Sequence, residues 1–158
     1  MKNRAFTLIE LLVVVLIIGV LVAIALPQYR VAVAKADVAK VISLVKVIAE
    51  QQRVYHLANN RYADNLEDLD ITVNAPDDWW CHLYKGSSVT GENNAVECAK
   101  PINNPTLAVV YYYGERTNRR EMENQIYCWT NDTFARRVCS TFGPLLNNNG
   151  TEYRYLIQ

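Results

Sequence analysis

The sequence predicts an α+β fold, in which a long N-terminal α-helical spine, transmembrane and then amphipathic, packs against a small antiparallel β-sheet head. Three observations predict it. Residues Phe6–Leu26 are almost all apolar, a helical apolar pattern continues to Tyr55, and short aromatic or β-branched segments separated by turn signals follow. The apolar stripe of such a helix and one face of a sheet can bury each other.

Composition limits the classes of function before any motif is considered. The 158 residues include 16 Lys and Arg and 16 Asp and Glu, so the formal net charge is zero. A neutral chain has no overall attraction to nucleic acid or to acidic substrates. All four cysteines follow the apolar run. An even set of cysteines after a hydrophobic N-terminal segment indicates export to an oxidising compartment.

The apolar run Phe6–Leu26 is long enough to cross a membrane. About twenty residues form a helix of roughly 30 Å, which matches the hydrocarbon thickness of a bilayer. Ala23 and Ala25 supply the small-residue pattern of a conventional secretory signal, but the run is too long for one and helix-compatible sequence continues to Leu57. We therefore interpret the run as the start of one helix that extends from about Phe6 to Asn59.

The second half of this helix is amphipathic. Its apolar residues recur at alternating spacings of four and three, with Gln52 as an interruption. They are Ala34, Val38, Val41, Val45, Ile48 and Tyr55. The pattern predicts that this stripe packs against the domain that follows.

Two residues weaken the first half of the helix. Pro27 removes one backbone hydrogen bond and its ring clashes with the carbonyl of Ala23, and Gly19 has low helix propensity. We expect the helix to bend or loosen between Gly19 and Pro27.

The head is expected to be an antiparallel meander of three or four strands, with a short helix or turn at residues 64–69 and a short helix at Phe134–Phe142. The expected strands are Trp79–Tyr84, Leu107–Tyr113, Gln125–Thr130 and Glu152–Ile157.

The four cysteines allow three disulfide connectivities, and the sequence alone does not choose among them. The helix at Phe134–Phe142 would bring Cys139 back towards the strand that carries Cys128, so we prefer Cys128–Cys139, which leaves Cys81–Cys98. Each bond would stabilise the fold by about 3 kcal/mol in the chain-entropy model.

A family resemblance begins at the N-terminus. Phe6-Thr7-Leu8-Ile9-Glu10, after a short basic leader with Lys2 and Arg4, resembles the class III signal of type IV pilins and pseudopilins. The resemblance continues through the apolar run to Pro27, along the amphipathic helix, and into Asn60-Arg61-Tyr62 and Leu66–Leu69. It is close over the first sixty residues and holds only in plan over the last ninety. A C-terminal disulfide loop also resembles type IV pilins.

The resemblance implies how the chain would be processed and where it would reside. A prepilin peptidase would cut between Ala5 and Phe6 and methylate the new Phe6 amine. The family usually has Gly before the scissile bond, whereas this chain has Ala5. The precursor would reside in the bacterial inner membrane with its head outside the cytoplasm, as the basic leader also indicates. The subunit would then join an extracellular pilus.

The resemblance also implies an organisation and an assembly site. Residues 1–5 would be the leader, 6–27 the transmembrane and assembly half of the helix, 28–60 its amphipathic half and 61–158 the globular head. Glu10 would meet the Phe6 amine of a neighbouring copy and set its axial register, since an acid in a bilayer is costly and calls for a partner. Gly19 and Pro27 would allow the helix to bend. The simpler alternative to this pairing is that the Glu10 side chain reaches water at the membrane interface.

The predicted function is therefore that of a structural subunit of a type IV pilus, for adhesion, motility or DNA uptake. The alternative is a major or minor pseudopilin of a type II secretion system, and a membrane-anchored enzyme or binding module is the remote one. The expected partners are other copies of the chain, the prepilin peptidase, the inner membrane and the pilus assembly platform. We expect no enzymatic activity, no catalytic residue and no cofactor.

Three other features of the sequence have ordinary explanations. Cys81-His82 and the distant His56 lack the spacing of a zinc site, so we expect no metal. A basic region suggests DNA or a host surface as partner, but interleaved acids favour ordinary solvated charge. Its residues are Arg116, Arg119, Arg120, Arg136 and Arg137 among Glu115, Glu121 and Glu123. A strand with aromatics on both faces explains Tyr111-Tyr112-Tyr113 more simply than an adhesive patch.

Overall fold

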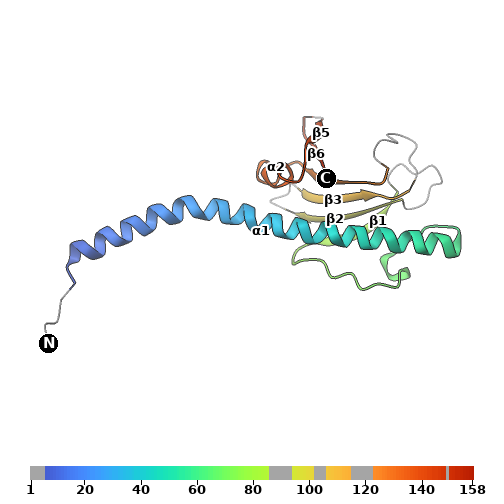
Figure 1. The fold of residues 1–158 in the computed structure, drawn as a ribbon, viewed down its shortest axis with the longest axis horizontal. Helices are drawn as coiled ribbons and strands as arrows, with labels where there is room; N and C mark the ends of the chain where they lie inside the picture. Colours follow the sequence, from blue (N-terminus) through green and yellow to red (C-terminus); the bar gives the residue numbers. More distant parts are fainter. Residues whose placement is uncertain (1–5, 86–93, 102–105, 115–122, 149) are drawn as a thin grey trace.

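A computed structural model describes residues 6–85, 94–101, 106–114, 123–148 and 150–158 of the chain. One long helix, α1 (Leu8–Asn59), lies along a six-stranded antiparallel sheet with its C-terminal half, while its N-terminal half extends away from the head (Figure 1). The α+β fold predicted from the sequence is confirmed. The leader, residues 1–5, lies outside the described residues.

Helix α1 has 52 residues and begins and ends within two residues of the predicted bounds. It ends at Asn60, which adopts a left-handed backbone conformation (φ 54°) and donates its N–H to the carbonyl of His56. The helix continues through Gly19 and Pro27 without interruption, and its N-terminal half is inclined to the half beside the sheet (Figure 1). Pro27 therefore does not end the helix, although its ring nitrogen has no N–H to donate.

The sheet has the strand order β1-β2-β3-β4-β6-β5, and every neighbouring pair is antiparallel. The first four strands form an antiparallel meander in chain order, and β6 then pairs with β4 and leaves β5 at the edge. The four predicted strands correspond to β1, β3, β4 and β6. The strands are β1 (Trp80–Tyr84), β2 (Ala95–Pro101), β3 (Thr106–Tyr112), β4 (Gln125–Thr130), β5 (Leu145–Asn148) and β6 (Tyr153–Leu156).

The predicted number of strands was wrong, because β2 and β5 were not expected. Strand β2 contains Ala95, Ala99, Lys100 and Pro101, residue types that are rare in strands. It forms because it is paired along its length between β1 and β3, where burial outweighs local propensity. Strand β5 is a short edge strand with a register shift and little apolar alternation.

The short helices lie close to their predicted positions. A 3₁₀ turn, Leu66–Asp68, has Asn65 as its N-cap residue, and α2 (Thr133–Cys139) has Asp132 as its N-cap. The Asp132 carboxylate accepts the N–H of Ala135 at 2.8 Å. Helix α2 is three residues shorter at its C-terminal end than the predicted Phe134–Phe142.

The apolar stripe of α1 forms one side of the main core, as predicted. Val38, Val41, Val45 and Ile48 are fully buried against the sheet and α2, and Ala34 and Tyr55 pack partly buried against the same cluster. Each fully buried aliphatic side chain contributes roughly 1.5–3 kcal/mol relative to an exposed one. This burial fixes the head to the helix, and thus fixes where the free half of α1 emerges.

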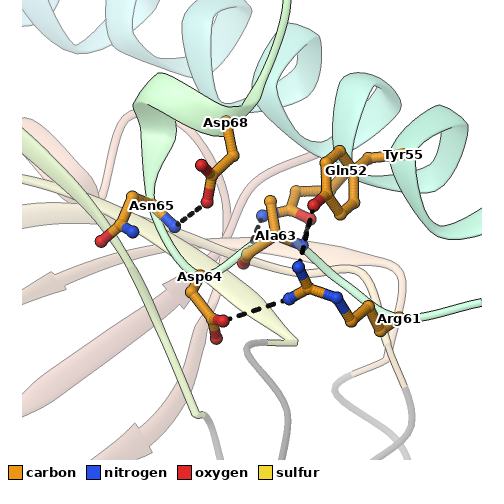
Figure 2. Close-up of polar contacts among 7 residues, drawn as sticks. All are labelled: Gln52, Tyr55, Arg61, Ala63, Asp64, Asn65 and Asp68. Carbon is orange, nitrogen blue, oxygen red and sulfur yellow. Dashed lines mark hydrogen bonds and ion pairs between the residues drawn. The ribbon is translucent and has the colours of Figure 1, made fainter. Parts of the chain in front are cut away.

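Gln52, which interrupts the apolar stripe, is also fully buried and has a defined role. Its amide donates to the carbonyl of Ala63 at 3.2 Å and accepts the N–H of Ala63 at 2.9 Å (Figure 2). The loop after α1 is thereby tied back to the helix. Arg61 supports the same turn through Asp64 and the Tyr55 hydroxyl, and Asp68 accepts the N–H of Asn65 (Figure 2).

Replacing Gln52 with Leu should lower the free energy of unfolding by about 2 kcal/mol, because the buried polar groups of Ala63 lose these partners. Thermal unfolding of the full chain in detergent, followed by near-ultraviolet circular dichroism, measures this. Gln51→Leu, at the partly exposed neighbouring position, is the control and should change little. Equal losses in both variants would contradict the role of the amide.

Candidate assembly site

The N-terminus of α1 is closed by a reciprocal capping box between Thr7 and Glu10. The Thr7 hydroxyl accepts the N–H of Glu10 at 3.3 Å, and the Glu10 carboxylate accepts the N–H of Thr7 at 2.8 Å and its hydroxyl at 2.6 Å. The sequence analysis missed this arrangement, although Thr-x-x-Glu before an apolar run is its signature. Glu10 thus orders the start of its own helix.

The geometry leaves one oxygen of Glu10 available. Both bonds from Thr7 go to Oε2, and within the described part of the chain Oε1 accepts no hydrogen bond. Glu10 and Phe6 are both exposed; Glu10 lies in the first turn of α1, and Phe6 directly precedes the N-cap residue Thr7. A fixed and exposed carboxylate oxygen at a helix end is suited to accept a cation from outside the chain.

The helix surface behind Glu10 is apolar and uncovered. Its large apolar side chains from Leu11 to Leu26 are between 46% and 63% exposed. Within the described residues, α1 is the one helix that is long and apolar enough to cross a membrane. An apolar surface of this length needs a cover of lipid or of other protein chains.

Gly19 lies in this uncovered half, and its environment bears on its role. A Cβ atom added at Gly19 would meet nothing within 4 Å. Packing within a single chain therefore does not require glycine here. Two explanations remain for a glycine at position 19. It provides backbone freedom to the helix, or it allows close contact with another chain.

Two disulfides cross-link the head, Cys81–Cys98 and Cys128–Cys139. These are the two pairings that the sequence analysis preferred. Cys81–Cys98 joins directly opposite residues of β1 and β2, and Cys128–Cys139 joins β4 to α2. Both bonds lie beside the face of the sheet that covers α1, because their cysteines belong to or pack against the main core.

The opposite face of the sheet carries a row of aromatic rings. Trp80, His82 and Tyr84 follow one another along β1, with ring centroids 4.8 Å and 5.6 Å apart. His82 lies opposite Glu97 of β2. Burial lowers the pKa of His82 and raises the pKa of Glu97, so the surroundings disfavour the charged form of each.

The tyrosine run, in which Tyr111 and Tyr112 end β3 and Tyr113 directly follows it, divides between the two faces of the sheet. Tyr111 and Tyr113 belong to the main core, whereas Tyr112 joins a second cluster on the other face, and all three are at most 8% exposed. The interpretation as a strand with aromatics on both faces is confirmed. A buried run offers no adhesive patch.

The remaining sequence candidates are mostly dispersed or outside the described residues. In the described ranges, no group of three or more His, Cys, Asp or Glu is placed to hold a metal ion. Cys81 is disulfide-bonded, and His56 packs against Tyr62. Arg136 lies 3.8 Å from the ring centroid of Tyr153. Arg116, Arg119, Arg120, Glu115, Glu121 and the cleavage residue Ala5 lie outside the described residues.

Comparison with known proteins agrees with this geometry. Residues 1–26 match a family model described as the prokaryotic N-terminal methylation motif. The capped helix start, Glu10 and the uncovered apolar helix all fall within the motif or continue directly from it. These features define a class of protein: one with an N-terminal methylation motif on a long helix whose apolar N-terminal half is not covered by its own head.

Similar proteins of known name indicate which members of this class the chain resembles. The chain is 35% identical over 75 residues to the type II secretion system core protein G of Aeromonas hydrophila, which is 48% of this chain and 52% of the relative. It is 31% identical over 103 residues to the type IV major pilin protein PilA of Myxococcus xanthus (63% and 46%). It is 38% identical over 90 residues to the type IV major fimbrial protein FimA of Dichelobacter nodosus (57% and 43%).

The matches span about half the length of these curated relatives. Together, the methylation motif, the relatives and the helix-on-sheet fold support the type IV pilin family for this chain. Proteins of this family are structural subunits and in general are not enzymes.

Proposed function

We propose that the chain is the structural subunit of a type IV pilus and polymerises through α1 into an extracellular filament. The observation that carries the proposal is the uncovered apolar half of α1, which begins at a capped carboxylate and falls within the methylation motif. Lipid covers this surface in the precursor, and other copies of the chain cover it in the filament. The filament serves adhesion, motility or DNA uptake.

The proposed organisation follows from the same division of the chain. Residues 1–5 are the leader, 6–27 the membrane and assembly half of the helix, 28–60 the half that carries the head and 61–158 the head. A prepilin peptidase removes the leader between Ala5 and Phe6 and methylates the Phe6 amine. The precursor is held in the inner membrane, with its head and disulfides outside the cytoplasm.

The proposed assembly step pairs Glu10 of one copy with the Phe6 amine of the next. The free Oε1 of Glu10 accepts the charged amine while Oε2 stays bonded to Thr7. A buried pair of this kind fixes axial register, because a copy displaced along the helix axis would leave both charges unpaired in apolar surroundings. Gly19 and Pro27 let the helix adapt between lipid and filament.

A second candidate function is that of a pseudopilin in a type II secretion system. The similarity to core protein G over about half of the chain favours it. The Cys128–Cys139 loop of the head favours the pilus, since such a loop resembles type IV pilins. Both functions use the same assembly site.

Mass spectrometry of the protein isolated from membranes of its own cells tests the processing. The expected mature chain begins at Phe6, with one methyl group on its amine. A mature chain that begins after Ala25 would identify a conventional signal peptide and refute the proposed function. A chain that keeps residues 1–5 would contradict cleavage at Ala5.

A further inference from the structure

A cavity of about 440 Å³ lies where the free half of α1 enters the head. The helix lines one side of it, and the ends of β2 and β3 together with α2 line the other. Its lining includes Tyr29, Arg30, Val33, Trp79, Lys100 and Phe134. The walls are mainly apolar and aromatic, and charged groups stand among them.

The charged groups of the cavity have both signs. Arg30 and Asp37 line it, and within the described part of the chain neither forms a hydrogen bond or an ion pair. The Lys100 ammonium lies 3.7 Å from a carboxylate oxygen of Asp78, whose side chain is 78% exposed. The ammonium also donates to the carbonyl of Asp77 at 3.5 Å. Because the Asp78 carboxylate is largely exposed, its attraction for Lys100 is weak, and Lys100 can exchange it for another anion. The cavity therefore suits a ligand that carries both a negative and a positive group.

The depth of the cavity relative to the proposed membrane span identifies the source of such a ligand. If Phe6–Leu26 crosses the hydrocarbon, Arg30 lies four residues further, which is about 6 Å along the helix axis. That distance falls within the headgroup layer of a bilayer. Tyr29, Trp79 and Phe134 also resemble the aromatic residues that gather at this level.

We propose that this cavity binds the headgroup of a membrane phospholipid that carries a phosphate and a free ammonium, such as phosphatidylethanolamine. The phosphate lies between Arg30 and Lys100, the ammonium reaches towards Asp37, and the glycerol rests on the aromatic wall. This inference rests on the membrane anchoring in the proposed function. The bound lipid holds the head against the membrane surface until the subunit leaves for the filament.

The lipid chemistry makes the proposal specific. A choline headgroup has no N–H to donate to Asp37, and a glycerol headgroup has no cation for it. The other plausible occupant, a second copy of this chain, would bring protein side chains to the cavity instead of lipid. The two occupants give cross-linked products of different mass.

The test uses the full-length precursor in nanodiscs of phosphatidylethanolamine and phosphatidylcholine, or of phosphatidylcholine alone. A p-benzoylphenylalanine photoprobe replaces Val33, which lines the cavity and is 43% exposed. The matched control places the probe at Ala32, which is exposed at the same depth but does not line the cavity. Mass spectrometry identifies the cross-linked partner.

The Val33 probe should capture phosphatidylethanolamine at least fivefold more often than the Ala32 probe. Arg30→Gln and Lys100→Gln should reduce this capture without changing the yield at Ala32, and Asp37→Asn should remove the preference for ethanolamine over choline. Equal capture at both probe positions, or no lipid preference, overturns the proposal, as does a product that contains two copies of the chain.

Retention in the nanodisc, checked by size-exclusion chromatography, distinguishes failure of the lipid site from failure of the membrane anchor. A precursor that is retained without selective capture refutes the lipid site and leaves the proposed function standing. A precursor that is not retained refutes the membrane anchor and the lipid site together.

Discussion

Replacing Glu10 with Gln should abolish filament assembly while the precursor still inserts into the membrane. The substitution removes the charge that the Phe6 amine of the next copy would meet. It keeps the capping box, because glutamine at this position accepts the Thr7 N–H as glutamate does. Loss of one partner of a buried charge pair costs about 3–5 kcal/mol, enough to reduce assembly by more than a hundredfold. Counting filaments by electron microscopy, with the precursor level measured in membranes, reports both effects.

Thr7→Val is the matched control for this experiment. It removes the hydroxyl that caps the helix, at a cost of about 1 kcal/mol, but leaves the Glu10 charge in place. Filaments should still form, in reduced number at most. If Thr7→Val stops assembly and Glu10→Gln does not, then Glu10 acts as a helix cap and the proposed register role is wrong.

Replacing Gly143 with Ala should destabilise the head more than Gln52→Leu does. A Cβ atom at this position would stand 1.8 Å from the backbone carbonyl oxygen of Leu156. The chain passes so closely here because Leu156 donates its N–H to the carbonyl of Pro144 at 3.0 Å. Strand β6 and its pairing with β4 would have to shift, since backbone atoms cannot yield as a flexible side chain does.

The expected loss for Gly143→Ala is about 3 kcal/mol, at the upper end for overpacking, and a fall in Tm of roughly 10 °C or more. Thermal unfolding of the full chain in detergent measures it. Gly19→Ala is the control, because its added methyl group meets no atom and alanine favours a helix. An unchanged Tm for Gly143→Ala would show that β6 does not pack as described.

The features that the sequence predicted are those with a strong local pattern. The spacing of Val38, Val41, Val45 and Ile48 predicted the buried face of α1, and the segment Gln125–Thr130 was predicted with its observed bounds. Strand β2 was missed because Ala95, Ala99 and Pro101 have low strand propensity, and only pairing with distant segments makes them a strand. The local pattern of residues does not predict pairing with distant segments.

In the candidate site too, features with a local pattern were predicted and features that depend on distant residues were missed. Glu10 stood out because an acid in an apolar run is rare, and Thr7-x-x-Glu10 contained a capping signal that the sequence analysis did not use. The buried Gln52 was seen only as an interruption, since its partner is the backbone of Ala63, eleven residues away. The cavity beside Arg30 combines residues from α1, β2, β3 and α2, so no sequence window contains it.

Whether this chain is a filament subunit is tested most directly by electron microscopy of filaments sheared from its own cells, with peptide identification of their protein. We expect thin surface filaments whose main protein begins at N-methylated Phe6. Filaments of unchanged number and composition in cells that lack this chain, with the chain itself found only in membranes, would contradict the account.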